Sequence, residues 1–451
     1  MIGAALSRWT MAYFAAALLS LLAAEIMMTV GFGFPAESVS APDTLVLVHL
    51  VTIGWLSLVM CGALFQFVPV LTATPLHSDR LQLPALALLV AGLTALVLGF
   101  LRLDGRARFE FPFLSVAAAL LGAGFALVIW NIALTLRDAR PLALPAGFIG
   151  IGLAAAGAAA ALGIIFALTL DGTTSSAAFV NILGRALPLH IVAGLGGWLT
   201  VTAMGVTYRL LAMFMLAPDV DGASPRATLW LAALALTLLV TGGMATVLAQ
   251  RSLAPVLVST LLVAIAALAL YGRDVLRLYR SRKRRPLELN GVTAGVALVN
   301  LMLAAILCVV LTLVGRFSDY IGALVFLFGF GWLSGLMLSQ MYKIVAFLTW
   351  LEVYGPVLGK TPTPRVQDLV AERPAARWFL LFFFGVWIAT VALLADAGQI
   401  FRIAALAMTA VTCGIVVQMV KTRRLANVPE PRRLPGNAVP PRLLFSSTKP
   451  T

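Results

Sequence analysis

Long apolar stretches recur along the whole of this 451-residue chain, and they restrict the folds open to it. A helix that crosses a bilayer needs about 20 mostly apolar residues. By this criterion we predict twelve membrane spans, at about 8–33, 44–70, 82–103, 111–136, 143–170, 186–217, 227–249, 253–279, 290–316, 319–350, 376–396 and 398–421. We therefore expect an all-α membrane protein with a single polytopic membrane domain at 1–421.

The composition agrees with a chain that faces lipid. Hydrophobic residues make up 61% of it and charged residues 11%, whereas soluble domains have about 45–50% apolar and about 25% charged residues. The first span lacks a signal-peptide cleavage pattern, so we expect a retained helix. The segment 422–451 is rich in proline and basic residues, and we expect a disordered cytoplasmic tail there.

Basic residues gather in alternate loops. The cluster from Arg273 to Arg285 and the basic tail fall on the same side as the N-terminus. The positive-inside rule then predicts both termini in the cytoplasm, in a bacterial-type inner (plasma) membrane. We interpret the cluster as a topology signal, with contact to anionic lipid as the alternative. The net charge of +14 does not indicate nucleic acid, because it lies between spans and in the tail.

One sequence element occurs three times, in the second, sixth and tenth predicted spans. Each copy has a small residue seven positions after its tryptophan, an aromatic residue at ten positions and a polar residue at eleven. The copies begin with Gly54-Trp55-Leu56-Ser57, Gly197-Trp198-Leu199-Thr200 and Gly331-Trp332-Leu333-Ser334. One copy in every four spans predicts three four-helix repeats, at about 1–141, 142–286 and 287–421.

The spacing places a polar side chain on the same face as the tryptophan in each of these helices. Eleven residues are about three helical turns, so the tryptophan and the polar residue share a face. The polar residues are Gln66, Arg209 and Lys343. The small residue between them allows a neighbouring helix to approach closely.

The repeat and the segment His49-Leu50-Val51-Thr52-Ile53-Gly54-Trp55 resemble subunit I of the haem–copper oxidase superfamily. The resemblance implies a ring of twelve helices with threefold pseudosymmetry. His49 matches in kind the second-span histidine that ligates the low-spin haem in that superfamily. His190 matches the region of a copper-ligating histidine. The NnrS haem and copper membrane proteins are a further possible relative.

The chain also departs from the oxidase pattern. It has three histidines in all, fewer than an oxidase needs for its metals, and the seventh and tenth predicted spans contain none. The family's oxygen reduction is therefore not expected. We expect one haem at most and regard a copper site as unlikely, and we leave open whether the chain is an enzyme.

His49 and His190 are the candidate haem ligands, since imidazole is a common haem ligand and intramembrane histidines are costly. Gly194 and Gly197 follow His190 on one helix face and could form a flat groove for a porphyrin. The alternative is that these glycines only pack helices. The two histidines precede their tryptophans by different spacings, so their rings point to different sides unless the glycine-rich helix is distorted.

A second interpretation is a cofactor-free transporter of a small solute or ion. Glu25 lies inside the first span, where a carboxyl is either protonated, paired or part of a water path. Gln66, Arg209 and Lys343 could converge on an anion path, or their long side chains could reach the headgroups. Transporters more often contain paired inverted repeats, which favours the haem-binding or redox- and gas-responsive interpretation.

A structural or assembly subunit without any site is the third interpretation. The expected partners are the lipid bilayer and either a redox partner or oxidase-assembly subunits, with no nucleic acid. The sequence contains no GxxxxGK[ST] phosphate loop, no HExxH and no CxxCH haem-attachment motif.

Overall fold

The computed structural model describes residues 6–106, 110–436 and 438–446, and these residues form helices and connecting turns without any strand. Within them, twelve helical stretches are long and apolar enough to cross a membrane. Their bounds are Thr10–Val30, Pro42–Thr72, Asp79–Leu103, Phe113–Asp138, Leu144–Leu170, Leu187–Met215, Ala223–Leu248, Ala254–Ser281, Leu289–Leu313, Phe317–Val357, Glu372–Leu394 and Gly398–Arg423. The prediction of a polytopic, all-helical membrane protein is confirmed, and the predicted span limits agree to within several residues.

The chain divides into two compact units. Unit 1 comprises residues 1–66 and 286–451, and unit 2 comprises residues 67–285. The boundary falls inside helix α3 (Leu58–Thr72).

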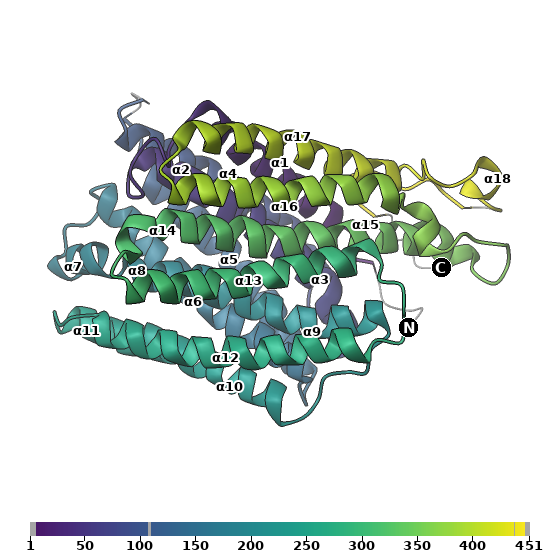
Figure 1. Ribbon diagram of the computed structural model, residues 1–451, viewed down its shortest axis with the longest axis horizontal. Helices are drawn as coiled ribbons and strands as arrows, with labels where there is room; N and C mark the ends of the chain where they lie inside the picture. Colours follow the sequence, from purple (N-terminus) through teal and green to yellow (C-terminus); the bar gives the residue numbers. More distant parts are fainter. Residues whose placement is uncertain (1–5, 107–109, 437, 447–451) are drawn as a thin grey trace. The chain divides into compact units, whose positions relative to one another are not determined.

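Unit 1 is built from both ends of the chain. Helix α1 packs against α17, α13 packs against α15, and α16 lies beside α17 (Figure 1). Its helices are α1 (Thr10–Val30), α2 (Pro42–His49), η1 (Leu50–Ser57), the first part of α3, α13 (Leu289–Leu313), α14 (Phe317–Phe326), η5 (Leu327–Ser334), α15 (Gly335–Tyr354), η6 (Gly355–Val357), η7 (Val366–Leu369), α16 (Glu372–Leu394), α17 (Gly398–Arg423) and α18 (Glu430–Arg433).

Unit 2 contains the middle of the chain. Helix α4 packs against α5, and α10 packs against α12 (Figure 1). Its helices are the rest of α3, η2 (Asp79–Leu81), α4 (Gln82–Leu103), α5 (Phe113–Asp138), α6 (Leu144–Leu170), α7 (Ala177–Arg185), α8 (Leu187–Ile191), η3 (Val192–Val201), α9 (Thr202–Met215), α10 (Ala223–Thr237), η4 (Leu238–Gly242), α11 (Gly243–Leu248) and α12 (Ala254–Ser281).

Glycine and proline set the ends and contacts of these helices. Helix α1 ends at Gly31, which has a φ of 79°, and the next N–H, of Phe32, donates to the Met27 carbonyl. This left-handed termination favours glycine because a side chain is strained there. In unit 2, a Cβ on Gly99 would lie 2.4 Å from a Leu114 side-chain carbon. Glycine therefore permits the close approach of α4 and α5.

The described part of the segment after Lys421 contacts the rest of unit 1; residues 437 and 447–451 of the expected disordered tail lie outside the described residues. Arg423 forms a 2.6 Å ion pair with Glu352, and both side chains are almost completely buried. The Arg423 guanidinium also donates to the Arg442 and Phe445 carbonyls. A buried carboxylate on α15 thus anchors this segment to the rest of unit 1.

Candidate functional site

In all three copies of the repeated element, the Gly-Trp pair lies in a π-helix. Trp55 is in η1, Trp198 in η3 and Trp332 in η5. A π-helix has i→i+5 hydrogen bonds, is rare, and is often found at functional sites. The helix distortion that would change the register between each histidine and its tryptophan is therefore present in the copies that carry His49 and His190.

The hydroxyl residue two positions after each tryptophan makes the same hydrogen bond in every copy. It donates to the carbonyl five residues earlier, whereas a hydroxyl in an α-helix bonds three or four residues back. The bonds are Ser57 to Thr52 at 2.7 Å, Thr200 to Leu195 at 2.8 Å and Ser334 to Gly329 at 2.8 Å. This hydroxyl thus bonds a carbonyl of the widened turn in all three copies.

The small residue of the first two copies packs on an aromatic side chain near the start of α1 or α6. A Cβ on Gly62 would lie 2.7 Å from the Tyr13 Cβ, and one on Gly205 would lie 2.5 Å from the Phe148 Cβ. The aromatic residue three positions later contacts the same ring in each copy, with centroids 5.6 Å apart both for Phe65–Tyr13 and for Tyr208–Phe148. Glycine is required here by helix contact.

The third copy uses different contacts. Ser339 replaces the glycine, and its hydroxyl donates to the Gly335 carbonyl at 2.6 Å. Tyr342 packs against Phe379 of α16, with ring centroids 5.7 Å apart. The third copy therefore keeps the π-helix but not the glycine contact.

The three polar residues at the end of the element each have a partner within their own unit. The Gln66 side-chain oxygen accepts a 2.8 Å hydrogen bond from the Ser7 backbone N–H. Lys343 pairs with Glu288 at 2.5 Å, and Arg209 pairs with Asp219 at 2.8 Å. The two cations are thus neutralised locally, which weakens the case for a shared anion path.

His49 is half-buried at the end of α2, directly before η1. Its Nδ1 lies 2.7 Å from the Leu45 carbonyl oxygen, one turn earlier in the same helix. A carbonyl only accepts, so Nδ1 carries the proton and the lone pair of the neutral ring is on Nε2. The ring has the tautomer of an Nε2 metal ligand.

His190, in α8 just before η3, is held by one face of α6. Its Nδ1 lies 2.9 Å from the Ala159 carbonyl oxygen, and its ring centroid lies 5.4 Å from that of Phe166. Gly163 lies between these two residues, and a Cβ there would be 3.2 Å from the His190 Cε1. Residues 159, 163 and 166 share one helix face, so α6 fixes both the tautomer and the orientation of the ring.

The two glycines proposed as a porphyrin groove face neighbouring helices. A Cβ on Gly197 would lie 2.4 Å from the Ala155 Cβ and 2.9 Å from a Leu236 methyl carbon. A Cβ on Gly194 would meet Ala159 at an ordinary 4.0 Å. These distances favour the helix-packing interpretation, most clearly for Gly197.

Glu25 is completely buried in α1. One of its carboxyl oxygens, Oε1, accepts a 2.9 Å hydrogen bond from the Thr412 hydroxyl of α17. The other, Oε2, has no hydrogen-bond partner among the described residues. A neutral, protonated carboxyl suits this environment, because an ionised one would be costly in lipid without a cation.

Three acids that have partners in the folded chain were not predicted as site residues. Asp274 of α12 accepts a 3.0 Å hydrogen bond from the Tyr208 hydroxyl, while Glu288 and Glu352 pair with Lys343 and Arg423. Asp274 and Glu288 lie near basic residues in the sequence, so each resembled part of a charged loop. Only their partners in the folded chain distinguish these acids from the acids of a solvated loop.

Within the described residues, no three or more His, Cys, Asp and Glu side chains come together as a metal-binding group. No protein-family model matches the chain, and no curated protein matches it.

Proposed function

We propose that this chain is an integral membrane protein that binds one haem through His190, with His49 as the second candidate ligand, and that it responds to redox state or to a gas. The observation that carries this proposal is the seat of His190 on α6. Histidines that ligate a metal usually donate their other ring N–H to a carbonyl or carboxylate. His190 Nδ1 does so toward Ala159, which directs the Nε2 lone pair to a ligand.

The proposal includes three four-helix repeats, as in subunit I of the haem–copper oxidases. It is supported by the three π-helices, by the identical hydroxyl-to-carbonyl bonds and by the matching aromatic contacts of the first two copies. It also includes a bacterial-type plasma membrane with both termini cytoplasmic, and a redox protein or an oxidase-assembly subunit as partner.

Residues of α6 orient the His190 ring and cover one side of it. The Ala159 carbonyl holds the proton on Nδ1, Gly163 leaves room for the ring, and Phe166 covers one side of it. A bound haem would supply one-electron redox chemistry and a position for a diatomic gas. With three histidines in the whole chain, we do not propose a terminal oxidase.

The optical spectrum of purified protein, expressed with ample haem, tests this proposal. We expect a Soret band that is lost or shifted in His190→Ala and unchanged in His77→Ala, a control at an exposed loop residue. Loss in His49→Ala alone would transfer the assignment to His49. A colourless wild-type protein would overturn the haem proposal.

Proton transport without a cofactor is the second candidate, and one observation favours it. Glu25 is wholly buried with one oxygen unpartnered among the described residues, as expected for a carboxyl that exchanges a proton. Proton uptake by proteoliposomes under an imposed membrane potential, lost in Glu25→Gln, would support it. Equal uptake by both proteins would exclude this role for Glu25.

A further inference from the structure

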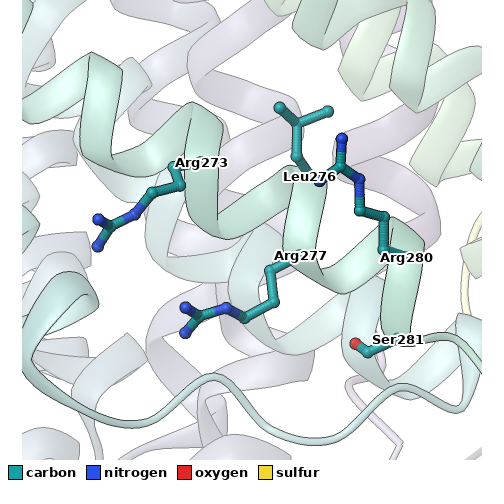
Figure 2. A pocket seen from close by; sticks show the side chains of 5 residues that line it. All are labelled: Arg273, Leu276, Arg277, Arg280 and Ser281. Carbon is teal, nitrogen blue, oxygen red and sulfur yellow. The ribbon is translucent and has the colours of Figure 1, made fainter.

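Three arginines form a stripe near the end of α12. Arg273, Arg277 and Arg280 are spaced four and three residues apart, which places them on one side of the helix. With Leu276 and Ser281 they line a hollow of about 430 Å³ (Figure 2). The Arg273 and Arg277 side chains extend in the same direction in Figure 2, and Arg280 rises toward Leu276.

These arginines are exposed, and among the described residues none makes a salt bridge or side-chain hydrogen bond. Other arginines of unit 2 do have carboxylate partners: Arg209 pairs with Asp219, and Arg226 with Asp221. Asp274 lies between them in sequence but is buried and accepts from Tyr208. The stripe is therefore a concentrated positive charge without an internal counter-ion.

The stripe continues a helix face that suits lipid. Only 17% of the apolar window of α12 is buried, less than in any other of the twelve spans found in the described residues. Leu276, beside the arginines, is 57% exposed. An arginine near a span end lies along the apolar surface and places its guanidinium at the headgroups. Its ligand would thus be an anion joined to apolar chains.

We propose that Arg273, Arg277 and Arg280 bind the phosphate of an anionic phospholipid, whose acyl chains lie along α12. Guanidinium groups bind phosphate oxygens in pairs of parallel hydrogen bonds, which a lysine ammonium cannot reproduce. Each basic group near a membrane surface adds to the attraction for anionic lipid. This site is independent of haem binding, so either proposal can fail alone.

Native mass spectrometry of detergent-solubilised, full-length protein incubated with phosphatidylglycerol or phosphatidylcholine tests the site. We expect wild-type protein to retain phosphatidylglycerol preferentially. The triple variant Arg273→Gln, Arg277→Gln, Arg280→Gln should bind it about 100-fold more weakly. A control with Arg137→Gln, Arg140→Gln and Arg226→Gln removes as many exposed charges from helix ends in unit 2 and should bind as wild type does.

Two further variants and one competitor complete the test. Arg277→Gln alone should weaken binding about 5-fold, and Arg277→Lys should recover only part of that loss because it lacks the paired hydrogen bonds. Inorganic phosphate should not displace the lipid. Equal retention by wild type and the stripe variants, or ready displacement by inorganic phosphate, would overturn the proposal.

Discussion

The second and third copies of the Gly-Trp element each contain a π-helix, but different side chains lie next to η3 and η5. Before η3, His190 is oriented by the Ala159 carbonyl of α6. Beside η5, Asn300 of α13 donates to the Gly331 carbonyl at 3.3 Å and accepts from the Trp387 indole at 2.8 Å. The π-helix is thus preceded by an oriented histidine in the second copy, whereas in the third copy it accepts a hydrogen bond from an asparagine that also bonds a tryptophan. The residues around the π-helix thus differ between the two copies, while its conformation is the same.

The largest effect on stability is expected where the second copy needs glycine and the third has serine. In Gly205→Ala the new Cβ would lie 2.5 Å from the Phe148 Cβ and 2.8 Å from the Pro145 carbonyl oxygen. Overpacking of this kind costs about 1–3 kcal/mol, and contact with backbone leaves little relief. Denaturant titration in detergent micelles should report this loss of unfolding free energy.

Gly150→Ala is the matched control for that substitution, since nothing lies within 4 Å of a Cβ there. We expect it to be near neutral or stabilising, because alanine is the better helix former. Equal stability of Gly205→Ala and Gly150→Ala would show that the helix contact in the second copy does not require glycine.

Asn300→Leu should break the network of the third copy. It removes two hydrogen bonds, from Asn300 to the Gly331 carbonyl and from the Trp387 indole to Asn300, and each such bond contributes about 0.5–1.5 kcal/mol. The unfolding free energy should fall, while any haem absorption stays unchanged. A changed Soret band in Asn300→Leu would mean that the third copy also shapes the haem site.

The hydroxyl residue two positions after each tryptophan should contribute less to the unfolding free energy than the Asn300 network does. Ser57→Ala and Thr200→Val each remove the hydrogen bond to the carbonyl five residues earlier. Such a bond contributes about 0.5–1.5 kcal/mol, and we expect similar losses in both copies. Thr241→Val, at an exposed hydroxyl that bonds four residues back, should change stability less. Unequal losses in the two copies would argue against a repeated device.

The smallest effect is expected for an ion pair in the loop between α15 and α16, where water rather than helix packing surrounds the charges. Hydrogen bonds from Arg365 hold the pKa of the Asp368 carboxyl below its usual range. Because the folded pKa is the lower one, the pair stabilises fully above the unfolded pKa of about 3.9 and loses this contribution as the pH falls through the folded value.

The pair contributes at most about 1 kcal/mol, because an exposed pair is screened by solvent. The difference in unfolding free energy between wild type and Asp368→Asn should therefore be small at neutral pH and vanish in acid. A difference that grows toward acid would contradict this sign.

The sequence was sufficient for the spans and for the Gly-Trp element. Span limits follow from runs of apolar residues, a local property that helix geometry converts directly into length. The equivalence of Trp55, Trp198 and Trp332 followed from fixed spacing along the chain. Their shared π-helical conformation is consistent with that spacing.

Contacts between helices could not be predicted from the sequence. Nothing near His190 in the chain indicates that Ala159, Gly163 and Phe166 hold its ring, because they belong to the preceding span. The π-helices were missed for a related reason: hydropathy does not register a shift of one residue in backbone hydrogen bonding. The sequence places Lys343 within a predicted span and gives no sign that Glu288 pairs with it.

Chemical rescue of His190→Gly tests the haem proposal most directly. The glycine variant removes the imidazole while leaving space for a free imidazole to take its place. We predict that the reduced-minus-oxidised spectrum of His190→Gly lacks the wild-type Soret feature and that added imidazole restores it. A wild-type protein without haem absorption, or a His190→Gly spectrum identical to that of wild type, would contradict the proposal.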